Sequence, residues 1–154
     1  MKINYFVIPL ITLATSVIGS VITGRGMDWY RTIKLPAWTP PGSFIGTVWT
    51  VLFVLATISA LIFWNRHQSL QSRQLIAALF IINAIANVGW SYLFFGEHLI
   101  KPAIFEAAFL GATCIALVIT LWPISTTAAL LIVPYVVWVG FATYLTYIIW
   151  LLNR

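Results

Sequence analysis

Residues 29–42 read WYRTIKLPAWTPPG, and the chain on either side of them is apolar enough to cross a bilayer. The three prolines of this segment remove backbone donors and push the preceding residues into extended conformations. We therefore expect a stiff loop here and no helix. Its aromatic side chains, Trp29, Tyr30 and Trp38, would form a flat surface at the membrane boundary. Such a surface favours a lid or a pocket wall for an apolar, planar molecule.

The composition predicts an integral membrane protein. Of the 154 residues, 62% are hydrophobic and only 7% are charged, against about 25% charged in an ordinary soluble domain. The length fits one domain, residues 1–154. The net charge of +5 comes from scattered residues, whereas a nucleic-acid surface needs clustered basic side chains. The lone Cys114 excludes an intrachain disulfide and a paired-cysteine metal site, which leaves it as a small packing residue.

Several stretches meet the length of about 20 mostly apolar residues that a transmembrane helix needs. They are Ile3–Thr23, Phe44–Trp64, Gln74–Phe95, Pro102–Trp122 and Thr127–Leu152. The first is too long for the apolar part of a typical signal peptide, so it counts as a span. The predicted fold class is an all-α membrane protein, a bundle of five transmembrane helices. A long aromatic, proline-rich loop, Gly24–Ser43, connects the first two helices, and the other connections are short.

The charged residues predict an orientation in the membrane. An odd number of spans places the two termini on opposite sides. The N-terminal side carries Lys2, Arg66 and Arg73, and the other side carries Arg25, Arg31, Lys34, Lys101 and Arg154. The positive-inside rule therefore places the first loop and the C-terminus in the cytoplasm. We expect a multi-pass protein of a bacterial cell membrane.

The third span carries a narrow polar and aromatic stripe made of Asn83, Asn87, Trp90 and Phe94. At 100° per residue these side chains fall within about 60° of each other. Carboxamides are costly at membrane depth unless they have partners, so the stripe faces protein or a cavity. Interhelical hydrogen bonding is one explanation. A mostly apolar ligand pocket with a few polar groups is the other.

Two further spans offer tryptophans toward the interior. Trp49 and Phe53 lie one turn apart on the second span. The fifth span aligns Trp138, Phe141, Ala142 and Leu145 along one side, after a proline at Pro134 that leaves one carbonyl without its donor. Core packing accounts for such rings. Together with Trp90 of the third span, however, the interior would hold three indoles, and each indole N–H needs a hydrogen-bond acceptor. A cavity with water or ligand acceptors meets that need more easily.

The first and fourth spans carry ridges of small residues, which let helix backbones approach closely. One ridge contains Ser16, Ser20 and Gly24, and the other contains Ala103, Ala107 and Gly111 with Ala108, Ala112 and Ala116 beside them. Packing inside the monomer and a homodimer face both remain open.

Glu106 lies one turn into the fourth span. A carboxylate at this position is stabilised by the positive end of the helix dipole and can reach the lipid headgroups.

Three long motifs resemble those of the translocator protein family, also called TspO/MBR, tryptophan-rich sensory protein or peripheral-type benzodiazepine receptor. The first is the loop already quoted, with Trp49 after it. The second is Asn87-x-x-Trp90-Ser91-x-Leu93-Phe94-Phe95-Gly96, and the third is Pro134-Tyr135-x-x-Trp138-x-x-Phe141-Ala142-Thr143-Tyr144-Leu145. The likeness covers essentially the whole chain.

The resemblance implies a five-helix bundle with a pocket that opens toward the first loop. It also implies a receptor or sensor for porphyrins such as protoporphyrin IX or haem, bound as ligand with no required cofactor, that regulates tetrapyrrole metabolism or a stress response. A tendency to form homodimers is implied as well. Together with the stripes it gives the candidate ligand-binding residues. They are Trp29, Tyr30, Trp38, Pro40, Trp49, Phe53, Asn83, Asn87, Trp90, Phe94, Trp138, Phe141, Ala142 and Leu145.

Other functions remain alternatives to a receptor. Light- or oxygen-dependent porphyrin degradation, reported for relatives of this type, would make the protein an enzyme, although the sequence shows no set of residues for hydrolytic catalysis. A transporter of porphyrin or another apolar metabolite is the other alternative. Transporters commonly show internal repeats and helices broken at mid-membrane, and neither is evident in the sequence. His67 and His98 are the histidines that could ligate haem iron, but each stands alone in a loop, which does not favour that role. Six residues separate Tyr147 from Arg154, one more than the proposed cholesterol pattern permits, so cholesterol binding is not supported.

Overall fold

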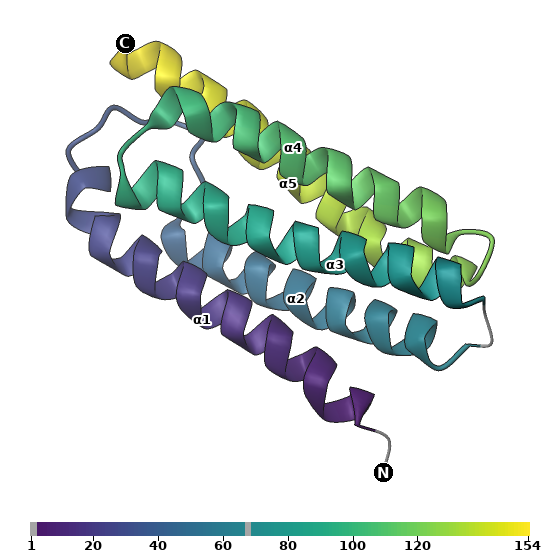
Figure 1. Cartoon of the computed structure of the whole chain (residues 1–154). Helices are drawn as coiled ribbons and strands as arrows, with labels where there is room; N and C mark the ends of the chain where they lie inside the picture. The colour runs from purple at the N-terminus through teal and green to yellow at the C-terminus, as the bar shows by residue number, and fades with distance from the viewer. Residues whose placement is uncertain (1–2, 67–68) are drawn as a thin grey trace.

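The computed structural model describes residues 3–66 and 69–154. The chain forms one bundle of long helices (Figure 1). In chain order the elements are α1 (Asn4–Tyr30), α2 (Gly42–Trp64), α3 (Leu70–Ser91), the π-helix η1 (Tyr92–Gly96), α4 (Ile100–Leu121) and α5 (Thr126–Asn153). With η1 counted as the last turn of α3, 5 helices within the described residues are long and apolar enough to cross a membrane. The predicted five-helix membrane bundle is confirmed.

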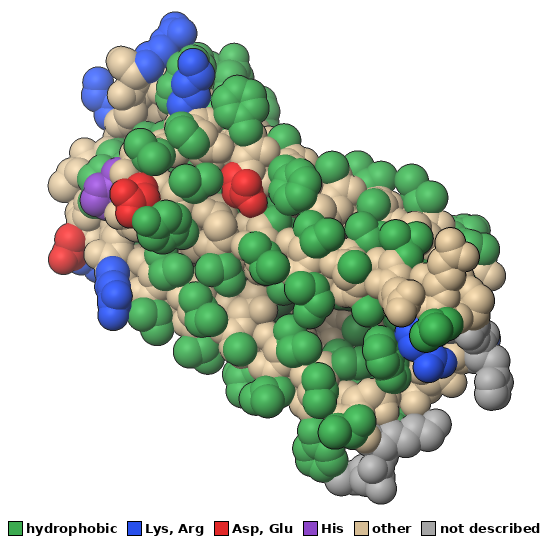
Figure 2. Space-filling view, in the orientation of Figure 1, with side chains coloured by type: hydrophobic (Ala, Val, Ile, Leu, Met, Phe, Trp, Pro, Cys, Tyr) green, Lys and Arg blue, Asp and Glu red, His purple; other side chains and the backbone are tan. Residues whose placement is uncertain are grey.

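The outer surface of the bundle is apolar, as Figure 2 shows for one face. Only 6% of the apolar window of α1 and 33% of that of α5 are buried inside the protein. Helices that are apolar all round suit a lipid environment. Serine side chains define two helix starts: Ser69 accepts a hydrogen bond from the Ser72 amide, and Ser125 accepts one from the Ala128 amide.

The tightest packing joins α4, α5, α2 and α3. Ala103 and Ala107 of α4 are fully buried, and a Cβ at Gly111 would lie 3.5 Å from a methyl group of Val139 on α5. The small residues of α4 therefore allow close packing inside the monomer. Ala108 and Ala112, on the outer side of the same helix, are exposed. A homodimer stays a prediction.

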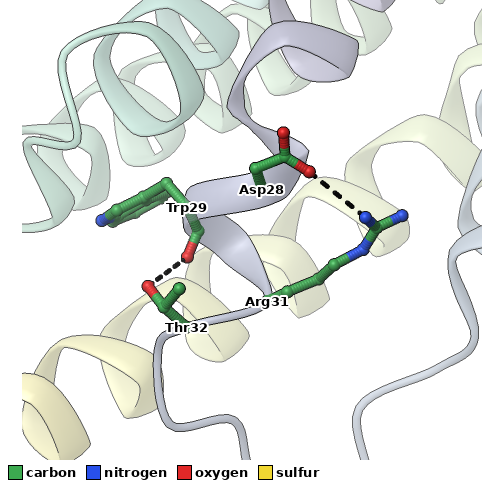
Figure 3. A network of polar contacts seen from close by, with 4 residues as sticks. All are labelled: Asp28, Trp29, Arg31 and Thr32. Carbon is green, nitrogen blue, oxygen red and sulfur yellow. Dashed lines mark hydrogen bonds and ion pairs between the residues drawn. The ribbon is translucent and has the colours of Figure 1, made fainter.

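Helix α1 is longer than predicted, and this corrects the proposed loop. It continues past Thr23 by about two turns, so Trp29 and Tyr30 belong to a helix. The prolines stand too far downstream to break this part of the helix. The predicted span ends at Thr23 because hydropathy falls there, but the helix itself continues beyond the apolar stretch. Near Tyr30 the helix ends with a hydrogen bond from the Thr32 hydroxyl to the Trp29 carbonyl, 2.7 Å, beside an exposed ion pair of Arg31 with Asp28 (Figure 3).

The connection between α1 and α2 is therefore residues 31–41, and it is fastened to α5. The Lys34 amide donates to the Asn153 Oδ1, and the Asn153 Nδ2 donates to the Lys34 carbonyl, both at 2.9 Å. The Trp38 ring stacks on Tyr144 at 5.8 Å. The remaining predicted spans agree with α2, α4 and α5 to within about one turn, and α3 begins earlier, at Leu70.

Charged residues gather at the two ends of the bundle (Figure 2). Arg66 and Arg73 lie at the end where α2 meets α3. The other described cations belong to the opposite end, where α1 ends and α4 begins. Lys2 and His67 lie outside the described residues. The predicted separation of charge follows from the helix order, while the orientation in a membrane stays a prediction.

Candidate ligand-binding site

A cavity of about 420 Å³ lies between α1, α2, α5 and the end of α3 with η1. This volume is within the usual range for small-molecule sites. Aromatic side chains from all four walls line it: Tyr30, Trp49, Phe53, Trp90, Phe94, Phe95, Trp138 and Phe141. The cavity opens between α1 and α2, where the lining residues Ser20, Gly24, Gly46 and Thr50 are exposed.

The aromatic walls are built from rings that pack on one another. Trp90 stacks on Phe94 at 5.3 Å, with 13° between the ring planes. Trp138 lies 5.2 Å from Phe141, and Trp49 meets Tyr135 edge to face at 5.8 Å. Aromatic pairs in these geometries stabilise each other beyond simple burial. The walls are therefore positioned by the protein itself.

Most of the predicted site residues line this one cavity. They are Tyr30, Trp49, Phe53, Asn87, Trp90, Phe94, Trp138, Phe141, Ala142 and Leu145. The tryptophans of α2, α3 and α5 thus converge on a common interior, as their helical spacing predicts.

Four predicted residues lie elsewhere. Trp29 packs behind the wall, with its ring stacked on His98 at 4.2 Å and its edge toward Phe94. Trp38 is 47% exposed and covers the outside of α5, and Pro40 lies in the connection, outside the cavity lining. Asn83 lines a different cavity, nearer the other end of the bundle.

The two asparagines donate hydrogen bonds between helices. Asn83 Nδ2 donates to the Thr113 hydroxyl at 2.8 Å and to the Cys114 sulfur at 3.2 Å. Asn87 Nδ2 donates to the Tyr135 hydroxyl at 2.9 Å. Interhelical hydrogen bonding, one of the two explanations for the stripe, therefore holds for both. Asn87 also lines the aromatic cavity, so for this residue both explanations apply.

Two indole N–H groups of the cavity walls have no partner in the described part of the chain. The Nε1 atoms of Trp90 and Trp138 are buried and make no hydrogen bond there. A buried donor without an acceptor costs about 1–3 kcal/mol. Both nitrogen atoms are covered by protein atoms, so a ligand acceptor would reach them only if the indole rings turned toward the cavity.

Sequence reasoning missed the α1 and α2 residues that form the open side of the cavity. They include Thr15, Ser16, Gly19, Ser20, Gly24, Gly42, Gly46 and Thr50. The small ridge of α1 predicts close helix packing, but small side chains also leave space next to a helix. A Cβ at Gly24 or Gly46 would meet nothing within 4 Å.

His98 and the acids, as the described residues place them, take no part in this cavity. His98 has a positive φ of 59° and its ring is engaged with Trp29. A Cβ at Gly89 of α3 would lie 3.2 Å from Glu106, which places this carboxylate between α3 and α4. No group of three or more His, Cys, Asp or Glu side chains that could hold a metal occurs among residues 3–66 and 69–154.

Comparisons with known proteins agree with the motifs and the fold. The model of the TspO/MBR family matches residues 6–151. The tryptophan-rich protein TspO of Bacillus cereus is 31% identical over 153 residues, which cover 99% of each chain. TspO of Chlorobaculum tepidum is 32% identical, over 92% of this chain and 90% of the relative. The human translocator protein is 27% identical, over 90% of this chain and 85% of the relative. The chain belongs to the TspO/MBR family of multi-pass membrane proteins.

Proposed function

We propose that this protein is a membrane receptor that binds a tetrapyrrole such as protoporphyrin IX in the aromatic cavity. The observation that carries the proposal is the convergence of aromatic side chains from four walls on one space of about 420 Å³. Rings at the cavity surface offer faces and edges to a planar, apolar macrocycle. The family resemblance supports the same ligand class.

The polar edge of the ligand would be held by the few polar groups of the walls. Ser20 stands at the opening between α1 and α2, beside Thr50, whose hydroxyl already donates to the Gly46 carbonyl. The unpartnered indole N–H groups of Trp90 and Trp138 lie deeper and would have to turn toward the ligand. A macrocycle can therefore bury its apolar part and keep its carboxylates near hydroxyls, N–H donors or the opening. Binding would order the ligand without any step of hydrolytic chemistry.

The test is a titration with protoporphyrin IX, followed by the absorbance of the porphyrin. Trp49→Ala and Trp138→Ala should each weaken binding by about 1–3 kcal/mol, because each ring buries macrocycle surface. Trp122→Ala is the matched control, since Trp122 is 51% exposed at the end of α4 and lies outside the cavity. Unchanged affinity in both cavity variants would refute the proposal. Parallel titrations with haem and a sterol would define the ligand class.

Light-dependent degradation of the bound porphyrin is a second candidate function. The stacked pair of Trp90 and Phe94 at the cavity wall favours it, because an indole near a photosensitiser can donate an electron. Illumination of the complex, with the porphyrin absorbance followed over time, separates the two functions. Stable absorbance indicates binding alone.

We also propose that the connection 31–41 and the C-terminus face the cytoplasm. The described cations are more numerous at that end than at the end with Arg66 and Arg73, as the positive-inside rule requires. A cysteine introduced at Lys34 in a Cys114→Ala background should react with a membrane-impermeant thiol reagent only after cells are opened. Reaction in intact cells would reverse the assignment.

A further inference from the structure

A second cavity, of about 330 Å³, lies at the end of the bundle where α2 meets α3. Its walls come from the first half of α1, the second half of α2, the middle of α3 and Tyr135 of α5. Thr15 and Phe53 line both cavities, so these two side chains form part of the partition between them. The second cavity is thus a separate space, which the aromatic site does not use.

The walls of the second cavity offer hydrocarbon and almost no free hydrogen-bonding capacity. Its polar side chains already have protein partners: Asn83 donates to Thr113, the Thr15 hydroxyl donates to a backbone carbonyl of its own helix, and Asn4 donates to Asn65. The remaining lining is largely isoleucine, valine, alanine and phenylalanine. An occupant of this cavity must therefore be apolar along its length.

The cavity opens sideways toward the membrane. Val7 and Ile11 of α1 and Ile81 of α3 line it and are also exposed on the outer surface. Figure 2 shows a hollow on this face, between α1 and α3. Along α1 the lining runs from Ile3 to Thr15, a length of about 18 Å at 1.5 Å per residue. This is close to half of the roughly 30 Å hydrocarbon core, the depth that one acyl chain occupies.

An unmatched cation stands at the membrane-boundary end of the cavity. The Arg73 guanidinium carbon lies 5.6 Å from the centre of the Trp64 ring, and Trp64 lines the cavity. The Arg73 Nε is buried and has no hydrogen-bond partner in residues 3–66 and 69–154. The three acids of the chain, Asp28, Glu97 and Glu106, all belong to the opposite end of the bundle. No carboxylate side chain of this chain can therefore pair with Arg73, and an anion must come from outside.

We propose that the second cavity holds one acyl chain of an anionic phospholipid from the surrounding bilayer, with the lipid phosphate on Arg73. A guanidinium suits a phosphate because its N–H groups can donate to two oxygens at once. The lateral opening admits an acyl chain from the neighbouring lipid leaflet, where the chain already lies at the depth of the cavity. The apolar walls then hold the chain, and Arg73 favours a headgroup that has no cation to offset the charge of its phosphate.

Native mass spectrometry of the detergent-purified protein tests the headgroup. Phosphatidylglycerol and phosphatidylcholine with identical acyl chains are titrated separately. Both lipids carry a phosphate, but the trimethylammonium group of phosphatidylcholine offsets its charge and is repelled by Arg73. The wild type should therefore retain one phosphatidylglycerol at about tenfold lower concentration than phosphatidylcholine. Arg73→Gln should remove this preference, and Arg66→Gln, which removes the same charge at the same end, should keep it. Equal retention of the two lipids by the wild type, or equal effects of the two variants, would overturn the proposal.

A second pair of variants tests the cavity itself. Ala77 lines the cavity, whereas the next residue, Ala78, is exposed on the outer surface of α3. Ala77→Phe should fill the space and abolish retention of the lipid, while Ala78→Phe should leave it unchanged, with size-exclusion chromatography and circular dichroism as the fold check. Retention by a folded Ala77→Phe would place the lipid elsewhere and overturn the assignment. Tighter binding of a free fatty acid with the same chain would overturn the choice of a phospholipid.

Discussion

Gly26→Ala is the substitution for which the structure predicts the largest effect from the smallest change. A Cβ at Gly26 would overlap the carbonyl oxygen of Phe95 and lie 2.8 Å from its Cβ and 2.9 Å from its carbonyl carbon. Two of these three atoms belong to the backbone of η1 and cannot rotate away, so α1 and η1 must separate. A π-helix at the end of α3 is itself a local irregularity of the kind that often accompanies functional sites.

Two opposing effects determine the magnitude. Overpacking costs about 1–3 kcal/mol, and a clash with backbone belongs at the upper end of that range. Alanine is a better helix former than glycine by about 1 kcal/mol, which offsets part of the cost. We expect Gly26→Ala to destabilise the protein by about 2 kcal/mol. Gly24→Ala, two residues earlier where a Cβ meets nothing within 4 Å, should stabilise it by up to about 1 kcal/mol.

Thermal unfolding in detergent, followed by circular dichroism, measures the difference between the two variants. For a chain of this size 1 kcal/mol shifts the midpoint by about 2–4 °C, so the variants should differ by about 6–12 °C. Gly26→Ala should also weaken porphyrin binding, because Met27 and Tyr30 on the same helix line the cavity. A midpoint for Gly26→Ala at or above that of Gly24→Ala would show that α1 and η1 do not approach closely here.

Three other measurements follow from individual contacts. Asn153→Ala removes both hydrogen bonds to Lys34. The Lys34 amide should then exchange with solvent at least tenfold faster, as measured by hydrogen–deuterium exchange. Unchanged protection of this amide would show that other contacts hold the connection. Asn87→Leu should cost about 1–3 kcal/mol because it leaves the Tyr135 hydroxyl without its donor. Adding Tyr135→Phe should recover part of that cost in a double-mutant cycle, and strict additivity would argue against the bond. Cys114 is fully buried, so a thiol reagent should label it only on unfolding; rapid labelling of the native protein would contradict its position.

Hydropathy and helical spacing were sufficient for the fold and for most of the cavity lining. The five spans follow from apolar length alone. The inward direction of Trp49, Trp90 and Trp138 follows from their spacing relative to Phe53, Asn87 and Phe141, since residues one turn apart share a face. These predictions succeed because both signals are local properties of single helices.

Depth and helix length were harder to predict. Asn83 and Phe94 share one face of the third span, but they lie about 16 Å apart along it. The Asn83 end of that stripe therefore faces the second cavity, and the Phe94 end faces the aromatic cavity. Helical spacing gives the direction of a side chain but not its depth along the helix axis, so the stripe alone predicts one pocket where the structure has two. The extension of α1 to Tyr30 does not follow from hydropathy for a related reason. Hydropathy indicates which residues lie in the membrane, and a helix can continue past the last of them.

The position of α1 explains why its inward residues could not be assigned from sequence. The buried residues of α1 are Asn4, Thr15, Gly19 and Gly26, and none of them contributes a large apolar side chain to the core. Both cavities lie between this helix and the rest of the bundle. Small and hydroxyl-bearing residues on α1 therefore have two effects, since they permit close contact at Gly26 and leave open space at Ser20 and Gly24. Only the distance to the facing helix separates these outcomes, and that distance is a property of the whole bundle.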